Sequence, residues 1–424
     1  MAIWSWMYSL MDPLPAFLIA IILIGLLVAR LKLHPFMGLL ASALVYGLLT
    51  GMGPEVIGHA TTGLARFFSA LAIIIFSGSV IAEYLRRSRS VDRIVADLLG
   101  LVGQRRGLMA SGLSGYLVSL PVMCCITSYL ILEPVAKEMG RRTDRSKARF
   151  QYMVAAASVI SYNLIYPSPV MVALTGALDV RPVDTLKLAI PLSLLLLAAA
   201  HFYLSRLPLT EVGTRPEPPA NLPSRLRAWL PLVLPMALIL AGLVTEAARF
   251  VGNPNVALLL GALVSVVLAR KKEIVKAATR RAGVIIFDLC GAGAFGYVIA
   301  QSDLGAALQG SLGGWVPLFA IPFILAALVQ LAQGSRLVTV VIAAEVMSGY
   351  PLDGLTLILL ISAGAFTFSY LSDPYFWLIK ETTGSSLREV VLGYTAPLTL
   401  CGLIVFAAAA LRWFFLVVQV DLPG

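Results

Sequence analysis

Long apolar runs separated by short charged clusters recur along the whole chain and constrain its fold more than any other feature. A helix that crosses a bilayer needs about 20 apolar residues. Only 13% of the 424 residues are charged, about half the share of a soluble domain. The sequence therefore predicts an all-α polytopic membrane protein, with apolar runs of roughly spanning length at 14–30, 35–51, 67–85, 150–165, 185–205, 229–248, 255–269, 282–300, 355–371 and 391–418.

The basic residues predict how the chain lies in the membrane. The net charge of +10 is not spread over one surface, as in a nucleic-acid-binding protein, but lies in clusters between apolar runs. Connections rich in Lys and Arg stay in the cytoplasm. Counting from these clusters, we expect a multi-pass protein of the cytoplasmic (inner) membrane with both termini external and no nucleic-acid partner; the clusters are 30–32, 86–106, 137–149, 206–227, 270–281 and 380–388.

Two apolar stretches, 107–136 and 315–348, are too long for one span and are interrupted internally. Basic clusters flank the first on both sides, so it is predicted to enter and leave on the cytoplasmic face as a re-entrant hairpin. The same count makes the second a hairpin from the outside. Each half also holds a proline-interrupted segment, predicted as a broken transmembrane helix at 150–184 and at 355–388.

The two halves therefore repeat one plan with opposite orientation in the membrane. We expect an N-terminal repeat at 1–206, a proline-rich cytoplasmic linker at 207–228 and a C-terminal inverted repeat at 229–424. Inverted repeats of this kind are typical of secondary transporters. A direct but weak sequence match supports the repeat: the stretch beginning SYNLIYPSPV aligns with that beginning FSYLSDPYF, so that Pro191 corresponds to Pro397.

Four interruptions of apolar segments, two in each half, indicate a binding site: SLPVMCCITS, SYNLIYPSP, LAQGSR and SYLSDP. Unpaired backbone groups are costly in hydrocarbon and survive where they line a cavity or are buried in protein. Helix N-termini exposed there suit a carboxylate. A proline kink patched by neighbouring helices is the alternative for any single break. The predicted substrate-binding residues are Thr127, Ser128, Ser161, Tyr162, Asn163, Tyr166, Ser168, Gln333, Gly334, Ser335, Arg336, Thr339 and Ser372.

Arg336 is the most informative single residue, because a cation at membrane depth needs a cavity or a partner. It presents its guanidinium fork to an anionic substrate, or forms an internal ion pair with Asp288, Glu345 or Asp373, or lies with its tip near the membrane surface. Asp373 and Asp288 are the candidate proton carriers. Asp373 has a second interpretation, in which it holds the loop through backbone N–H groups, and Asp288 has one as a buried, neutral acid.

Enzymatic and metal chemistry find no support in the motifs. The sequence has no HExxH motif, P-loop or nucleophile elbow. The glycine run GAGAFG at 291–296 lies in a predicted span, where close helix packing is the better interpretation. We therefore expect no enzyme, no metal and no cofactor beyond a coupling ion.

Several stretches resemble the gluconate permease family of proton symporters, within the broader ion-transporter superfamily. They are GAGAFGYVI at 291–299, AQGS at 332–335 and SDPYFWLIKETTGSSLREV at 372–390, in the order found in the family. The resemblance implies an all-helical carrier of small hydroxy-carboxylates with two hairpins, a homodimer in the lipid bilayer that works by an elevator-type shift.

The chain departs from that family at the site itself. Met123, Cys124 and Cys125 replace two aromatics and an acid, Tyr166–Ser168 replaces a stretch that often holds histidine, and Arg336 replaces a small residue. A gained cation and a lost acid favour a more anionic substrate. The sequence thus predicts a proton-coupled secondary transporter of a small organic anion, with a sodium-coupled dicarboxylate or sulfonate carrier, or an anion channel, as alternatives.

Overall fold

The computed structural model describes residues 11–102, 107–142, 147–207, 222–270, 273–312, 314–370 and 372–420, and within these ranges the chain is helical without strands. The N-terminal half holds α1 (Pro13–Gly25), α2 (Pro35–Leu49), α3 (Glu55–Arg87), α4 (Ser90–Val102), α5 (Gly107–Val122), α6 (Cys125–Arg142), α7 (Lys147–Leu164), α8 (Pro169–Ala177) and α9 (Pro182–Arg206).

The C-terminal half holds α10 (Arg225–Val244), α11 (Pro254–Ala269), α12 (Glu273–Ala300), α13 (Leu304–Leu312), α14 (Ile321–Gln333), α15 (Arg336–Val346), α16 (Gly354–Phe366), α17 (Pro374–Thr383), α18 (Leu387–Val390) and α19 (Ala396–Val420). Five-residue π-helical turns follow α1 and precede α19.

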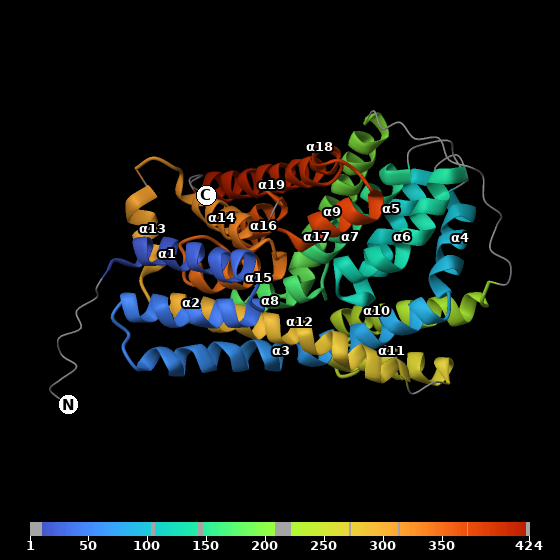
Figure 1. The fold of residues 1–424 in the computed structure, drawn as a ribbon, viewed down its shortest axis with the longest axis horizontal. Helices are drawn as coiled ribbons and strands as arrows, with labels where there is room; N and C mark the ends of the chain where they lie inside the picture. The colour runs from blue at the N-terminus through green and yellow to red at the C-terminus, as the bar shows by residue number, and fades with distance from the viewer. Residues whose placement is uncertain are drawn as a thin grey trace.

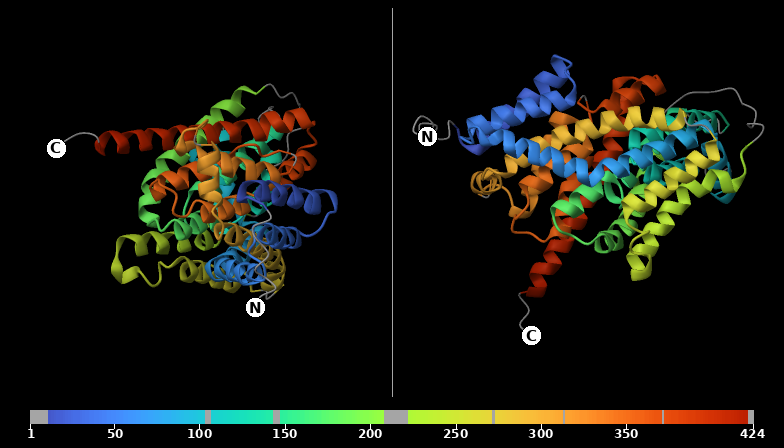
Figure 2. Two further views of the ribbon diagram at one scale, coloured as in Figure 1. Left: turned by 90° about the vertical axis from the view of Figure 1, so that its left-hand side faces the viewer. Right: turned by 90° about the horizontal axis from the view of Figure 1, so that it is seen from below.

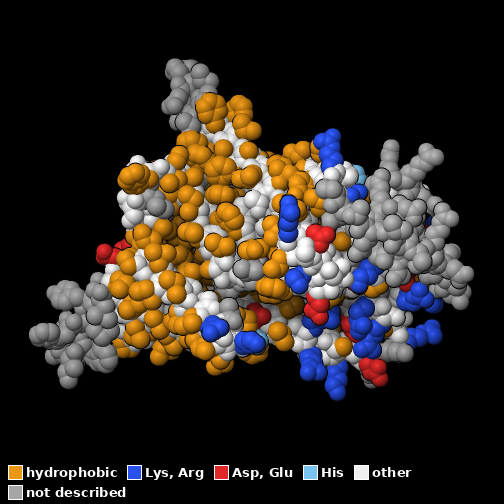
Figure 3. Space-filling view, turned by 45° about the horizontal axis from the view of Figure 1, so that its top comes forward, with side chains coloured by type: hydrophobic (Ala, Val, Ile, Leu, Met, Phe, Trp, Pro, Cys, Tyr) orange, Lys and Arg blue, Asp and Glu red, His pale blue; other side chains and the backbone are white. Residues whose placement is uncertain are grey.

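The surface of the molecule is suited to a bilayer. Among the described residues, six helical stretches are long and apolar enough to cross a membrane: Glu55–Arg87, Ala148–Ala177, Pro182–Arg206, Arg225–Val244, Glu273–Ala300 and Leu387–Phe415. Many large apolar side chains are exposed, such as Ile22, Phe202 and Phe414. They cover much of one end in the space-filling view, whereas Lys and Arg gather toward the other end (Figure 3). The chain is a multi-pass membrane protein, as predicted.

Helices α3 and α12 pack side by side along the long axis of the molecule (Figure 1). Glycines allow this contact: a Cβ on Gly63 would lie 2.2 Å from the carbonyl oxygen of Gly293. Above this pair lie one group formed by α5, α6, α7 and α9, and another formed by α14, α15, α16 and α19. Helix α19 runs obliquely, and its C-terminal end projects from the body (Figure 2).

Four interruptions separate helices at the sequence positions discussed above. Two residues, 123–124, join α5 to α6, and two, 334–335, join α14 to α15. Residues 165–168 separate α7 from α8, and residues 367–373 separate α16 from α17. At the α7–α8 and α16–α17 breaks, the second helix begins with a proline, Pro169 or Pro374. At the first position of a helix the missing N–H of proline costs nothing.

Helix α4 is held against α10 on the basic side of the molecule. Asp97 accepts hydrogen bonds from Trp229 (3.0 Å), Arg225 (3.1 Å) and Arg93 (3.2 Å). Burial alone would raise the pKa of Asp97, but the bonds from Trp229, Arg93 and Arg225 keep this pKa below its ordinary value. These bonds join α4 to the N-terminal end of α10.

The connection between α12 and α14 contains a further helix, α13, whose Leu304 and Leu308 are buried. Leu304, Leu308 and Leu312 are spaced as on one face of a helix, so the sequence carries a signal for it. Most of the predicted linker at 207–228 lies outside the described residues, which omit 208–221.

Candidate functional site

Two of the interruptions in the C-terminal half touch one another. Gly334, between α14 and α15, has a φ of 70°, a conformation that glycine adopts without strain. A Cβ on Gly334 would lie 2.1 Å from the carbonyl oxygen of Ser372 and 2.5 Å from the backbone N of Asp373. The glycine therefore lets the α14–α15 connection pack directly on the α16–α17 break.

Arg336, the first residue of α15, lies at this contact and is 5% exposed. Its Nη2 atom lies 3.3 Å from Oδ2 of Asp373 and donates to Oγ of Ser369 (2.5 Å) and Oη of Tyr394 (2.9 Å). Of the three acids proposed as partners, the structure selects Asp373. We call Arg336, Asp373, Ser369 and Tyr394 the arginine cluster.

The carboxylate of Asp373 holds the loop through a backbone N–H group, as one of its two interpretations predicted, and also faces Arg336. Its Oδ1 accepts a hydrogen bond from the backbone N–H of Tyr375 (2.8 Å) and so caps the N-terminus of α17. Its Oδ2 faces Arg336 and also accepts a hydrogen bond from Oη of Tyr394 (3.0 Å). One oxygen orders the break while the other compensates the buried cation.

Arg336 also has an unused donor. Its Nε is buried without a hydrogen-bond partner among the described residues. An unpaired buried donor costs about 1–3 kcal/mol, so such groups are rare unless they serve a ligand or a catalytic role. The guanidinium is therefore anchored on one side and available on another.

Sequence reasoning missed Ser369 and Tyr394. Tyr394 is fully buried in the π-helical turn before α19, and Ser369 lies in the 367–373 break. A tyrosine within an apolar run resembles a core residue, so its hydroxyl gave little signal. Ser369 could have been found, since it precedes Tyr370 in the predicted SYLSDP interruption.

The N-terminal half also contributes to the surroundings of the arginine cluster. Cys125, at the start of α6, and Tyr162 on α7 are buried and lie in the neighbourhood of Arg336. Nδ2 of Asn163 donates to the carbonyl oxygen of Ser362 in α16 (3.0 Å), which joins the two broken helices.

Other predicted residues have local structural roles. Ser168 caps α8 by accepting from the N–H of Met171, Ser128 donates to the carbonyl of Cys124, and Thr339 donates to the side chain of Gln330. Buried side-chain atoms without a hydrogen-bond partner among the described residues are Ser161 Oγ, Asn163 Oδ1, Gln333 Nε2 and Ser372 Oγ. Thr127 is buried, whereas Tyr166 and Ser335 are half-buried.

Asp288 lies apart from the arginine cluster. It pairs with His34 at the start of α2, with 3.4 Å between Oδ1 and Nδ1. The two carboxylates predicted as proton carriers therefore do not belong to one site.

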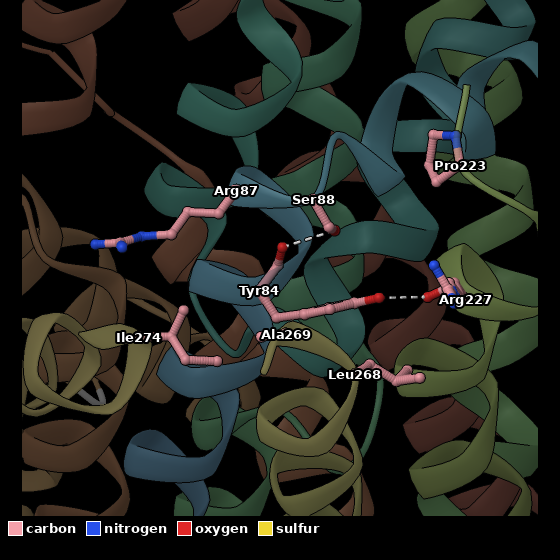
Figure 4. Close-up of a pocket in the computed structure, with 8 residues that line it drawn as sticks. All are labelled: Tyr84, Arg87, Ser88, Pro223, Arg227, Leu268, Ala269 and Ile274. Atoms are coloured by element: carbon pink, nitrogen blue, oxygen red, sulfur yellow. Dashed lines mark hydrogen bonds between the residues drawn. The ribbon is translucent and has the colours of Figure 1, made fainter. Parts of the chain in front are cut away.

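A cavity of about 410 Å³ occurs elsewhere, among the ends of α3, α10, α11 and α12 (Figure 4). There Oη of Tyr84 donates to the backbone carbonyl of Arg227 (3.0 Å), while the side chain of Arg87 points away from that pair. None of the predicted site residues lines this cavity.

The arginine cluster defines the kind of site. Within the described ranges, no three His, Cys, Asp or Glu side chains gather as ligands for a metal ion. An intramembrane cation that is buried, hydrogen-bonded and paired with one carboxylate is typical of pathways for charged solutes. Site and fold together define an all-helical membrane transporter.

The chain belongs to the GntP family of permeases, since the family model matches residues 13–414. The resemblance seen in the sequence is thus confirmed, and the family's members include gluconate permeases and related transporters.

Named relatives cover almost the whole chain. The low-affinity gluconate transporter of Escherichia coli K12 is 26% identical, over 90% of this chain and 94% of its own. The D-serine transporter DsdX of the same organism is 24% identical, over 97% of this chain and 100% of its own. The Gnt-II system L-idonate transporter of that organism is 23% identical, over 91% of this chain and 96% of its own. The solved YdaH transporter of Alcanivorax borkumensis shares the fold, with a TM-score of 0.62, 16% identity, and coverage of 85% of this chain and 89% of that one.

Proposed function

We propose that this permease is a secondary active transporter of a small organic anion, a hydroxy-carboxylate or related acid, driven by protons. The observation that carries the proposal is Arg336, a buried guanidinium with a free Nε donor at the contact between two helix interruptions. A carboxylate that reaches this donor gains a charge-assisted hydrogen bond, about twice as strong as a neutral one.

The relatives support the substrate class. Gluconate, L-idonate and D-serine, the solutes named for three of them, each carry a carboxylate and at least one hydroxyl group. The buried hydroxyls and amides near the interruptions suit such hydroxyls as hydrogen-bond partners; they include those of Ser161, Asn163 and Ser372.

Charge balance in a buried site gives a reason for proton coupling. In the structure Asp373 compensates Arg336, so the arginine cluster is formally neutral. A substrate carboxylate that replaces Asp373 at the guanidinium would leave one negative charge in excess, which is costly away from water. Protonation of Asp373 removes that excess. We infer that one proton enters with each carboxylate that binds.

Sodium coupling is the second candidate. Oγ of Ser161, Oδ1 of Asn163 and Oγ of Ser362 are buried and have no hydrogen-bond partner among the described residues. Neutral oxygens at broken helices can hold sodium. In this second candidate Asp373 keeps its charge and the substrate is a dicarboxylate or sulfonate, which the added positive charge of Arg336 favours.

The proposal includes an arrangement in the membrane. The α5–α6 and α14–α15 pairs act as re-entrant hairpins of two inverted repeats, 1–206 and 229–424, joined by a cytoplasmic linker. The basic end in Figure 3 faces the cytoplasm, which leaves both termini external in an inner-membrane protein. Following the resemblance, the transporter works as a homodimer by an elevator-type shift.

Uptake into proteoliposomes tests the function. Purified protein is supplied with gluconate, L-idonate, D-serine, succinate and ethanesulfonate, and pH and sodium gradients are imposed separately. We expect saturable uptake of at least one acid, driven by an inward proton gradient and abolished by Arg336→Ala but not by Arg412→Ala. Uptake that never saturates would indicate a channel. Sodium-driven uptake without proton entry would select the second candidate.

A further inference from the structure

A series of buried tyrosines leads from the arginine cluster toward the basic end of the molecule. The rings of Tyr394 and Tyr375 lie 5.2 Å apart and those of Tyr375 and Tyr129 5.4 Å apart, both edge to face. All three residues are fully buried. The series begins at Oδ2 of Asp373, which accepts the hydroxyl of Tyr394.

The series ends in a polar network between α6, α7 and α17. Oη of Tyr129 bonds Oγ1 of Thr382 (2.6 Å). Nε2 of Gln151 donates to Oη of Tyr129 (3.4 Å) and to Oε1 of Glu133 (3.1 Å), so these two oxygens share one amide group. The amide group of Gln151 thereby links the hydroxyl of Tyr129 to the carboxylate of Glu133.

Glu133 connects this network to solvent. Its side chain is 14% exposed and forms an ion pair with Lys137 on the next turn of α6. It lies eight residues beyond Cys125, about 12 Å along the helix at 1.5 Å per residue. Among the residues that the structure describes, the titratable groups that interact with it are Lys137 on its own helix and Tyr129, while Gln151 from α7 and Thr382 from α17 are neutral.

Tyr375 is the middle member and has an unusual hydroxyl. Its Oη is buried with no hydrogen-bond partner among the described residues. If Tyr375 served only to pack its ring, phenylalanine would serve equally well without leaving a buried hydroxyl unpaired. The ring of Tyr375 packs between those of Tyr394 and Tyr129, whose hydroxyls are hydrogen-bonded. A proton relay requires that movement of the Tyr375 side chain bring its hydroxyl to each neighbour in turn.

We propose that Glu133 is the cytoplasmic-side acceptor of the coupling proton and that Tyr394, Tyr375 and Tyr129 connect it to Asp373. The O–H bond of Asp373 breaks as its proton passes to Tyr394. Each hydroxyl in turn accepts one proton and gives up one, so the tyrosines are neutral before and after. The last transfer, from Tyr129 to Glu133, takes place when the side chain of Gln151, which lies between the two oxygens, moves aside. A new O–H bond forms on Glu133, which then releases the proton to water. This inference rests on the proposed function, because it presumes coupling through Asp373.

Measuring two modes of transport distinguishes a role of these residues in proton transfer from a purely structural role. The full chain is reconstituted with [14C]gluconate as the probe. Uptake driven by an inward proton gradient needs proton release at the cytoplasmic side. In the second mode, external labelled gluconate is exchanged for unlabelled gluconate inside the vesicle at equal pH. The transporter then returns with substrate bound and can keep its proton, so this mode does not need proton release. We expect Glu133→Gln to lower proton-driven uptake at least tenfold and to keep exchange within twofold of the wild type.

Tyr129→Phe is the second variant, since it removes the hydroxyl and keeps the ring; we expect the same split between the two modes. Glu345→Gln is the matched control, because Glu345 is a half-buried glutamate of α15 outside the tyrosine series. It should leave both modes within twofold.

The inference is overturned if Glu133→Gln and Tyr129→Phe leave proton-driven uptake unchanged. It is also overturned if Tyr129→Phe lowers both modes equally, since the network then only holds α6, α7 and α17 together. A wild type that takes up gluconate without proton entry refutes the proposed proton coupling, and this inference with it. If gluconate is not a substrate, the transported acid of the panel replaces it as the labelled probe, and a wild type that transports none of the panel refutes the proposed function itself.

Discussion

The ion pair between Arg336 and Asp373 makes a quantitative prediction about stability. Both side chains are nearly inaccessible, with 4% and 2% of their surface exposed. Removing one member of a buried pair leaves an uncompensated charge and costs about 3–5 kcal/mol. We therefore expect Asp373→Asn and Arg336→Met each to lower the free energy of unfolding by about that amount. Asn keeps an oxygen for the N–H of Tyr375, so loss of the α17 cap does not confound the first variant.

The double variant gives the decisive number. Arg336→Met combined with Asp373→Asn leaves no buried charge and loses only the hydrogen bonds of the arginine cluster, which cost about 1–3 kcal/mol. The sum of the two single effects should therefore exceed the double effect by about 3 kcal/mol or more, at or above the upper end of the coupling found between neighbouring residues. The measurement is unfolding in mixed detergent and dodecyl sulfate micelles, followed by tryptophan fluorescence.

Asp353 provides a matched control. It caps α16 through the N–H of Thr356, as Asp373 caps α17, and pairs with Arg412 at 2.9 Å, but the two side chains are 35% and 29% exposed. Asp353→Asn should cost about 1 kcal/mol or less. The reasoning is refuted if Asp373→Asn also costs less than 1 kcal/mol, because Asp373 would then be neutral in the resting site, or if the two single effects simply add.

Three further substitutions test the geometry. Gly334→Ala should strongly reduce both stability and uptake, because the added Cβ meets the backbone of Ser372. Gly349 has a similar φ of 83° but open space around it, so Gly349→Ala should cost only the roughly 1–2 kcal/mol of a left-handed residue. Thermal unfolding and uptake assays compare the two variants. Tyr394→Phe removes two hydrogen bonds of the arginine cluster and should destabilise the protein by about 1–3 kcal/mol in the same micelle assay. Asp288→Asn should leave proton-driven uptake within twofold of the wild type, and a loss of coupling would restore that residue as a proton carrier.

The sequence predicted those parts of the fold that depend on backbone chemistry. Pro169 and Pro374 cannot continue a helix from the preceding residue, and helices end before both. The charge of Arg336 required a partner at membrane depth, and a partner is present. The orientation of the halves in the membrane and the domain limits remain predictions.

The composition of the site could not be predicted, because it depends on packing between distant segments. Charge alone did not distinguish Asp288, Glu345 and Asp373 as partners for Arg336. The choice is made by Gly334, which brings the α14–α15 connection against residues 372–373. Tyr394 lies 58 residues from Arg336 in the sequence, within an apolar run, so its hydroxyl could be interpreted only once the fold was known.

The unused Nε of Arg336 leads to a last prediction, which separates binding from stability. A lysine at this position would keep a positive charge beside Asp373, but it has no planar fork and cannot anchor one side while offering another. Arg336→Lys should therefore stay within about 1–2 kcal/mol of the wild-type unfolding free energy, less than the cost of losing the charge. Its KM for the transported acid should rise at least tenfold, equivalent to about 1.4 kcal/mol of binding free energy. If Arg336→Lys transports with the wild-type KM, the guanidinium serves only to compensate Asp373, and the substrate carboxylate must be bound elsewhere.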